Sequence, residues 1–296
     1  MGRAKEIVVK VIPAKIANEF VKKHHYSGKV VQNSSLHFGA FLDGKLHGVM
    51  SYGSPLDKRK VLPLVQPSLW NEMLELNRMA FDDYLPKNSE SRCIAISVRL
   101  LKKNAPHVKW ILSFADGTQC GDGAIYRASG FVLTGLNKNT QVYEAPETKE
   151  AFSRMGLTKG NPGQVKKALS YSRTALTNLG NNGALKQRRD ISAAYGIDVT
   201  NLSGSSMKVY KEIGFNLKPG FQLRYIYLID KTCKITVPII PFSKIDEMGA
   251  GMYKGQRVSM SERRKQHADE ALPAVRLTSS QEEGFDSTHP LKINKD

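Results

Sequence analysis

Three polar side chains follow predicted helices or strands at points where they could transfer a proton or bind a ligand. Asp116 ends an apolar run of strand character and is followed by Gly117, and His25 and Tyr26 come directly after a helical pattern. Carboxylates and imidazoles are common proton carriers, and open α/β sheets bind ligands at the ends of their strands. We therefore expect these residues in one site, with Tyr26 stacking or hydrogen bonding. The structural alternatives are an Asp-Gly turn and a helix that simply ends in histidines.

Arg78 and Ser91 are candidates for binding an anion. Arg78 lies in a strand-like segment, where a lone buried charge is costly, so we expect it to pair with a carboxylate or an anionic ligand. A salt bridge to Glu75 or Asp82 is the simpler interpretation. Ser91 lies near the start of a predicted helix, where its hydroxyl and nearby amides could hold a phosphate. Capping of that helix by Ser89 or Ser91 is equally consistent with the sequence.

The elements that would position these residues follow from the apolar periodicity. The pair Asp43-Gly44 between two apolar runs is the strongest local signal, because it is typical of a tight turn in a β-hairpin. Gly130 is expected to end a short helix. Strands are expected at 6–12, 36–42, 46–52, 73–81, 108–115, 131–136, 223–229 and 235–240, and helices at 16–24, 89–103 and 123–129. This alternation predicts an α/β fold with helices flanking a central sheet.

Composition divides the chain into four parts. Residues 1–147 carry the predicted core, and residues 217–255 supply strands that complete it. Between them, residues 148–216 form an insertion with few large apolar residues and with eleven Lys and Arg against four Asp and Glu. Residues 256–296 are charged, Ser-rich and weakly hydrophobic, so we expect a loosely ordered tail.

The charge of the chain favours a polyanionic partner. Lys and Arg number 44 against 27 Asp and Glu, which gives a formal net charge of +17. Nucleic acid is the leading candidate, and the insertion is expected to make most of the contacts with DNA phosphates. A solvated basic surface is the alternative. The residues expected to contact DNA are Lys166, Lys167, Lys186, Arg188 and Arg189.

The cysteines suggest a reducing environment. Cys93, Cys120 and Cys233 are odd in number and widely spaced, so the sequence indicates neither a disulfide framework nor a structural zinc site. The chain also has no secretory signal pattern and no apolar stretch of about 18 residues. We therefore expect a cytoplasmic protein that does not bind membranes.

Several short strings resemble known families. The string YRASGF at 126–131 is similar to a motif of the GNAT acetyltransferases, although the chain has SESRCIA at 89–95 where those enzymes carry a glycine-containing phosphate loop. More narrowly, the chain resembles the Mom proteins of Mu-like phages over most of residues 10–255. That resemblance rests on HYS at 25–27, LNR at 76–78, FADG at 114–117, GAIYRASG at 123–130 and PGFQLRYIY at 219–227.

The resemblance implies a GNAT-like mixed sheet and a specific reaction. Mom proteins add a carbamoylmethyl group to the N6 amino group of adenine in duplex DNA, which protects phage DNA from restriction in the host cytoplasm. It implies catalytic roles for His25, Tyr26 and Asp116. Tyr126 resembles the tyrosine that acts as general acid in many GNAT enzymes, with a core aromatic as the alternative. The residues implied in cofactor binding are Arg78, Ser91 and Arg92.

The resemblance leaves the donor open. An acyl-CoA or a glycine-derived donor are both consistent with it, and acetyl-CoA alone cannot supply the nitrogen of the amide. A further interpretation is that His25 and Asp116 ligate iron, although no ligand spacing in the sequence demonstrates a metal site. The oligomeric state, monomer or homodimer, is also open. Two alternatives from other classes remain: a GNAT enzyme that acylates a protein or small amine, and a DNA-binding protein without catalytic activity.

Overall fold

The computed structural model of this chain describes residues 3–146, 148–154, 157, 189, 192–193, 196–202 and 206–271. The chain divides into two compact units, residues 1–260 and 261–296. Residues 261–271, which belong to the helix α10 (Met260–Ala271), are the described part of the second unit. The fold and the site described below belong to the first unit.

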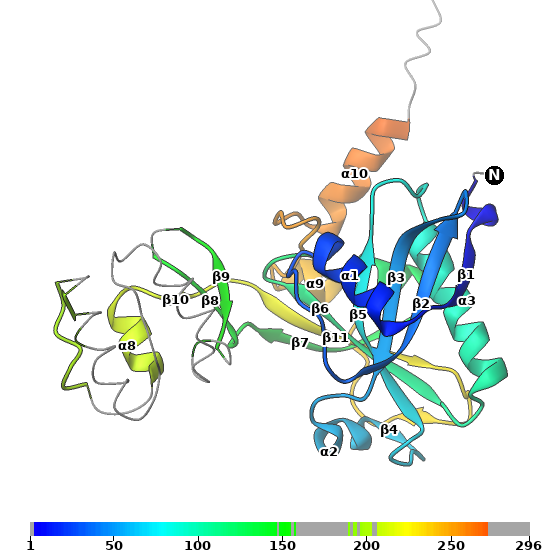
Figure 1. Ribbon diagram of the computed structural model, residues 1–296, viewed down its shortest axis with the longest axis horizontal. Helices are drawn as coiled ribbons and strands as arrows, with labels where there is room; N and C mark the ends of the chain where they lie inside the picture. The colour runs from blue at the N-terminus through cyan, green and yellow to red at the C-terminus, as the bar shows by residue number, and fades with distance from the viewer. Residues whose placement is uncertain are drawn as a thin grey trace, which may run out of the picture. The chain divides into compact units, whose positions relative to one another are not determined.

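A seven-stranded mixed sheet organises the first unit, with the strand order β1-β2-β3-β5-β6-β11-β7 (Figure 1). Its strands β5 and β6 pair in parallel, and the other neighbours in this sheet pair antiparallel. The expected α/β class and mixed central sheet are therefore confirmed. The strands are β1 (Val8–Val11), β2 (Ser34–Leu42), β3 (Lys45–Gly53), β5 (Met73–Phe81), β6 (Trp110–Gly117), β7 (Val132–Lys138) and β11 (Phe221–Leu228).

Helices cover both faces of this sheet. The helix α1 (Ala14–His24) packs Ala17 and Val21 against Val49 of β3. The helices α3 (Ser89–Asn104) and α4 (Ala124–Ala128) lie on the opposite face, where Ile94 of α3 shares a core with Met50 of β3. Val49 and Met50 are consecutive in the strand, so their side chains point to opposite faces. Both faces of the sheet are thus buried, and α1 ends at the edge of the face that it covers.

The tight turn predicted between β2 and β3 is confirmed. Asp43 and Gly44 both have positive φ angles, 51° and 74°, and Leu42 pairs with Lys45 across them. Two consecutive positive φ angles give a turn whose twist matches the twist of the flanking strands.

The strands β5 and β6 part beyond the middle of the sheet. Their pairing runs from Met73 opposite Trp110 to Leu76 opposite Ser113 and then stops, although both strands continue. Next to this point β5 contains a bulge, because Ser51 and Tyr52 of β3 pair with Arg78 and Leu76 and leave Asn77 unpaired. Parting strands of this kind create an opening at which α/β sheets bind ligands.

Two local predictions are wrong, and the expected turn at Asp116-Gly117 is confirmed in part. Both residues belong to β6 and pair with Gln222 and Phe221 of β11. The backbone carbonyl of Asp116 also accepts hydrogen bonds from the amides of Cys120 and Gly121, both at 3.0 Å, so the chain turns directly after this strand. The strand expected at 235–240 is reduced to β12 (Lys234–Ile235), which pairs with β4 (Val65–Gln66) in a separate small sheet. The reason is Pro238, which has no amide hydrogen to donate to a strand partner.

The start of α3 also differs from the prediction. Neither Ser89 nor Ser91 occupies the N-cap position, which is taken by Asn88 with a left-handed φ of 68° and no side-chain cap bond. Two short helical segments, α2 (Lys58–Val61) and α9 (Ser243–Glu247), complete the helices adjoining the large sheet.

The described parts of the basic insertion contribute to a small separate core. The strands β8 (Val142–Glu144), β9 (Ala151–Ser153) and β10 (Asn216–Leu217) form a three-stranded sheet, accompanied by α8 (Ser206–Glu212). Tyr143, Phe152 and Phe215 are buried together there. Of the residues expected to contact DNA, Arg189 is exposed, and Lys166, Lys167, Lys186 and Arg188 lie outside the described residues, as does the chain beyond 271. The four-part division therefore stays a prediction.

Within the ranges that the structure describes, no helix combines the length and the apolar character needed to cross a bilayer.

Gly44 and Gly123 have similar backbone angles, but we expect a methyl group added at each to reduce the free energy of unfolding by different amounts. Gly123 has φ +83°, and a Cβ there would lie 2.4 Å from the ring of Tyr225, whereas Gly44 has φ +74° and nothing within 4 Å. We expect Gly44→Ala to cost about 1–2 kcal/mol of unfolding free energy from the left-handed backbone. Gly123→Ala should cost a further amount of about 1–3 kcal/mol from overpacking. Urea unfolding monitored by circular dichroism checks this, and equal losses would contradict it.

Candidate functional site

The carboxylate of Asp116 is the centre of the site. Its Oδ2 accepts hydrogen bonds from the Tyr26 hydroxyl and from Gln119 Nε2, both at 3.0 Å. Its Oδ1 accepts from the backbone amide of Thr118 and from Gln222 Nε2, also at 3.0 Å, and from the Thr118 hydroxyl. A carboxylate offers about four lone-pair sites. Five donors therefore occupy its acceptor capacity, and Asp116 is suited to fixing its neighbours.

Tyr26 joins the end of α1 to the end of β6. Its bond to Asp116 spans ninety positions of the sequence, and 49% of the residue is exposed. Desolvation of the hydroxyl, followed by the negative charge of Asp116, raises the pKa of Tyr26 well above its usual value. The hydroxyl therefore stays protonated and donates to Asp116, while much of the ring remains available to a ligand.

His25 lies beside Tyr26 as a neutral imidazole. The two ring centroids are 4.4 Å apart. Burial, and then the positive charge of Arg78, lowers the pKa of His25 to about 4. Its Nδ1 accepts a hydrogen bond from the amide of Ser27 at 3.2 Å, and the Ser27 hydroxyl lies 2.8 Å from the same atom. These contacts assign the proton to Nε2.

Arg78 does not form the expected salt bridge. Its Nε donates to the carbonyl of Lys29 at 2.9 Å, and its Nη1 donates to the carbonyl of Asn77 at 2.7 Å. The carboxylate of Asp82 instead pairs with His47 at 2.9 Å. The salt-bridge interpretation is wrong because the loop after α1 brings a backbone acceptor to Arg78, a contact that spacing along β5 does not indicate. The expected anionic ligand stays a prediction. The Nη2 amine of Arg78 has no acceptor among the described residues.

Tyr126 approaches from the other face of the sheet. It is buried and packs against Phe131 and Tyr225, and the side chain of Ser113, whose hydroxyl donates to the carbonyl of Leu76, acts on its hydroxyl. Burial raises the pKa of Tyr126 to about 12. Ser113 is the last residue of β6 paired with β5, so the Tyr126 hydroxyl lies where the two strands part. Tyr126 is thus a core aromatic whose polar end reaches the opening.

Glu75 is a site residue that the sequence analysis treated only as a partner for Arg78. Burial raises the pKa of Glu75 to about 7, although the charge of Arg78 acts in the opposite direction. The charge of Glu75 also raises the pKa of Tyr126. Its position as an acid within the apolar strand MLELNRMAF was a signal that could have identified it. Gln119 and Gln222 were also missed. Gln222 reaches Asp116 only through the register of β6 and β11, and Gln119 reaches it through the fold of the loop that follows β6.

The predicted phosphate ligands are engaged by the protein. The Ser91 hydroxyl donates to the carbonyl of Asn88 at 3.2 Å, and Arg92 Nη2 donates to the carbonyl of Lys5 at 3.3 Å. The Ser91 hydroxyl is thus occupied, whereas Arg92 Nε is buried without a hydrogen-bond partner among the described residues. Their assignment to cofactor binding stays a prediction.

His25 and Asp116 also do not fit an iron site. The Asp116 oxygens are already bonded to five donors, and His25 Nδ1 is occupied by Ser27. In the described part of the chain no group of three or more His, Cys, Asp or Glu side chains could hold a metal ion. Two ligands with saturated lone pairs are a poor donor set for a transition metal.

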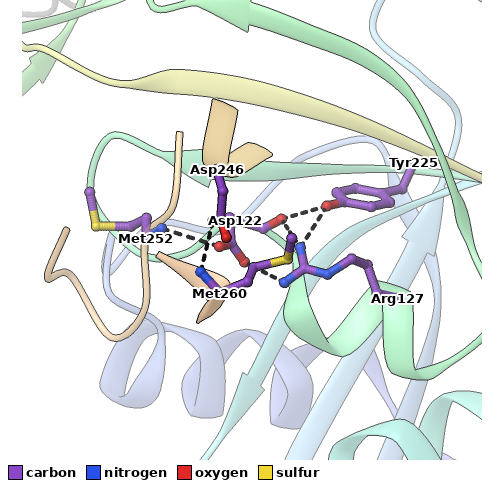
Figure 2. Close-up of polar contacts among 6 residues, drawn as sticks. All are labelled: Asp122, Arg127, Tyr225, Asp246, Met252 and Met260. Atoms are coloured by element: carbon purple, nitrogen blue, oxygen red, sulfur yellow. Dashed lines mark hydrogen bonds and ion pairs between the residues drawn. The ribbon is translucent and has the colours of Figure 1, made fainter. Parts of the chain in front are cut away.

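A buried ion pair fixes the far end of the loop that follows β6 (Figure 2). Asp122 is fully buried; its Oδ1 accepts from Arg127 Nη2 at 2.9 Å, and its Oδ2 accepts from the amide of Met252 at 3.2 Å. Its backbone carbonyl accepts from the Tyr225 hydroxyl at 2.5 Å and from Arg127 Nη1 at 2.8 Å. The loop is thus anchored at both ends, by Asp116 and by Asp122.

Removing one partner of this ion pair should be costly. Arg127→Ala removes the counter-charge that Arg127 supplies to the buried Asp122 carboxylate, and we expect a loss of about 3–5 kcal/mol of unfolding free energy. The control is Lys60→Ala, which removes an exposed ion pair with Asp57 and should have no measurable effect. Chemical denaturation of the variants tests this, and an Arg127→Ala protein as stable as the control would contradict it.

The sequence model of the Mom protein family matches residues 6–244. The methylcarbamoylase mom of Escherichia phage Mu is 36% identical over 138 residues, which are 46% of this chain and 57% of that relative. The match therefore spans little more than half the length of the relative.

Solved structures with a partial likeness are acetyltransferases. The acetyltransferase of Bacillus subtilis in complex with CoA is 8% identical with a TM-score of 0.35, covering 75% of this chain and 98% of that one. The ribosomal-protein-S18-alanine N-acetyltransferase of Escherichia coli is 13% identical with a TM-score of 0.33, covering 49% and 88%. The family match extends over most of the sequence and includes the strands and loops that carry the site. The chain belongs to the Mom protein family.

Proposed function

We propose that this protein transfers a carbamoylmethyl group to the N6 amino group of adenine in duplex DNA and thereby protects that DNA from restriction enzymes. The observation that carries the proposal is the hydrogen bond from Tyr26 to Asp116, which assembles a half-exposed aromatic ring beside an imidazole. This arrangement occurs in a chain of the Mom family, whose relative in phage Mu is named a methylcarbamoylase.

An adenine extruded from the duplex would be bound mainly by Tyr26 and His25. Extrusion costs a few kcal/mol, which enzymes offset by stacking and by hydrogen bonds to the base edge. The Tyr26 ring is fixed through its hydroxyl by Asp116 and offers the stacking surface. The Nε2–H of His25 can donate a hydrogen bond to a ring nitrogen of the base. Asp116 is then a positioning residue, held by donors from three segments of the chain.

Arg78 and Tyr126 are proposed to assist the group that leaves the donor. The free Nη2 of Arg78 can stabilise negative charge as it develops, and the Tyr126 hydroxyl can supply a proton. For the donor we favour an activated glycyl ester over an acyl-CoA. The glycyl group carries the nitrogen that becomes the amide nitrogen once the transferred group has rearranged to its carbamoylmethyl isomer. The engagement of Ser91 and Arg92 by backbone carbonyls is consistent with that preference.

Duplex DNA as a partner is supported by the charge of the chain. The formal net charge of +17 favours a polyanion, and binding through phosphates should weaken steeply as salt rises. The expected contacts of the insertion, Arg189 among them, belong to this proposal.

Mass spectrometry of digested plasmid DNA tests the proposed function. DNA from cells that express the protein should contain an adenosine in which a carbamoylmethyl group replaces one hydrogen. Asp116→Asn should lower its amount by about 10²-fold, because a misplaced Tyr26 no longer orients the base. The control is Glu19→Gln, which removes one exposed charge from α1 and should change nothing.

Two results would contradict the proposal. Unmodified adenosine in DNA from cells containing folded wild-type protein would exclude the activity. An adenosine carrying only an acetyl group would indicate an ordinary acetyltransferase.

A further inference from the structure

We propose that Glu75 is the catalytic base of this site and accepts the proton that leaves the amino group of the acceptor. The inference rests on the proposed function, and it assigns to Glu75 the role that the sequence suggested for Asp116. Two acids, Asp116 and Glu75, flank the opening between β5 and β6. Differences in their hydrogen bonding and burial assign them different roles.

The bulge in β5 places Glu75 on the same side of the sheet as Arg78. Without the bulge, residues three apart in a strand would point to opposite faces. Because Asn77 is the extra residue, Glu75 and Arg78 instead share the face opposite Leu76, which packs in the core below. Arg78 is bonded to the loop that carries His25 and Tyr26. Glu75 therefore faces the side of the site where the acceptor would bind.

The strand neighbours of Glu75 leave its carboxylate unsatisfied. Across the sheet it lies between Gly53 of β3 and Leu112 of β6, which bring neither a donor nor a charge. The charged group that acts on it is Arg78 from its own strand, which lowers its pKa, and the charge of Glu75 in turn raises the pKa of Tyr126 on α4. Glu75 forms no hydrogen bond with the described residues, so its oxygens keep their capacity to bind a proton.

The other groups of the site are poorer proton acceptors at neutral pH. Asp116 is saturated by five donors. His25, with a pKa of about 4, is a weak base. Cys120 has a raised pKa because it is desolvated and lies near Asp116, so its thiol holds its proton. General bases work best when their pKa lies near the pH of the reaction, and Glu75, with a pKa of about 7, meets that condition.

The proposed step balances without an oxidant or a metal. The lone pair of the amino nitrogen forms a bond to an electrophilic carbon of the donor. The bond from that carbon to its leaving group breaks, and the electron pair departs with the leaving group. The N–H proton moves to a carboxylate oxygen of Glu75 as the new bond forms. With a glycyl ester as donor, the products are the N-glycyl amine, the released anion and a protonated Glu75, which returns its proton to solvent. The glycyl group then rearranges to its carbamoylmethyl isomer, with no atom or electron added or lost.

The experiment compares Glu75→Gln with a matched variant, Glu72→Gln. Glu72 precedes the same strand but is bonded to Lys109 at 2.9 Å and lies outside the site. The rate of adenosine modification in purified DNA is measured between pH 5.5 and 8.5, using extract of the producing cells as the donor source. We expect the wild-type and Glu72→Gln rates to rise with pH and level off above about pH 7. Glu75→Gln should lose that rise and be slower by about 10²–10⁴-fold at pH 8.

Thermal unfolding provides a readout that does not depend on activity. Because the pKa of Glu75 is raised on folding, the ionised form destabilises the folded state, and stability falls as pH rises from about 4.5 through about 7. Glu75→Gln removes this loss. Its melting temperature relative to wild type should therefore be higher at pH 8 than at pH 5.

The outcomes separate the two proposals. If wild-type protein modifies adenosine but Glu75→Gln keeps the pH rise or loses less than tenfold, the base assignment is wrong and the proposed function stands. A melting-temperature difference that does not change with pH also overturns it, because Glu75 would not titrate near neutrality. If wild-type protein forms no modified adenosine, the proposed function fails and the base assignment fails with it.

Discussion

The site depends on how one carboxylate is held. Asp116 receives hydrogen bonds from Tyr26 after α1, from Thr118 and Gln119 in the loop after β6, and from Gln222 on β11. Two of these three segments are distant from Asp116 in the sequence, so the full set of donors forms only when β11 has entered the sheet in register with β6. A shift by one residue would turn Gln222 to the other face. Asp116 therefore couples the completion of the sheet to the position of Tyr26.

Buried polar contacts stabilise the loop that begins at Asp116. The Asp122–Arg127 ion pair and the Tyr225 hydroxyl fix the end of the loop that begins at Asp116. Gly123, which follows Asp122, leaves room for the Tyr225 ring that makes this contact. The polar network thus fixes the loop at one end while the ladder between β6 and β11 fixes it at the other. Rigid support of this kind is what a binding residue on a loop requires.

The sequence could predict the local structure of much of the sheet but not the partners in the site. The turn at Asp43-Gly44 and the span of β5 follow from residue type and period, which act over a few positions. The insertion of β11 between β6 and β7 does not, because it depends on contacts across about a hundred residues. The contacts of Arg78 and the raised pKa of Glu75 could not be predicted either, because the first depend on a distant loop and the second on burial.

A double-mutant cycle on Tyr26→Phe and Asp116→Ala tests the central claim most directly. The free energy of unfolding is measured for wild type, both single variants and the double variant at pH 7. If the Tyr26 hydroxyl is held by Asp116, the two changes should be coupled by about 0.5–3 kcal/mol, in the range found for residues that share a hydrogen bond. Effects that add within about 0.3 kcal/mol would contradict the account, because the two side chains would then act independently.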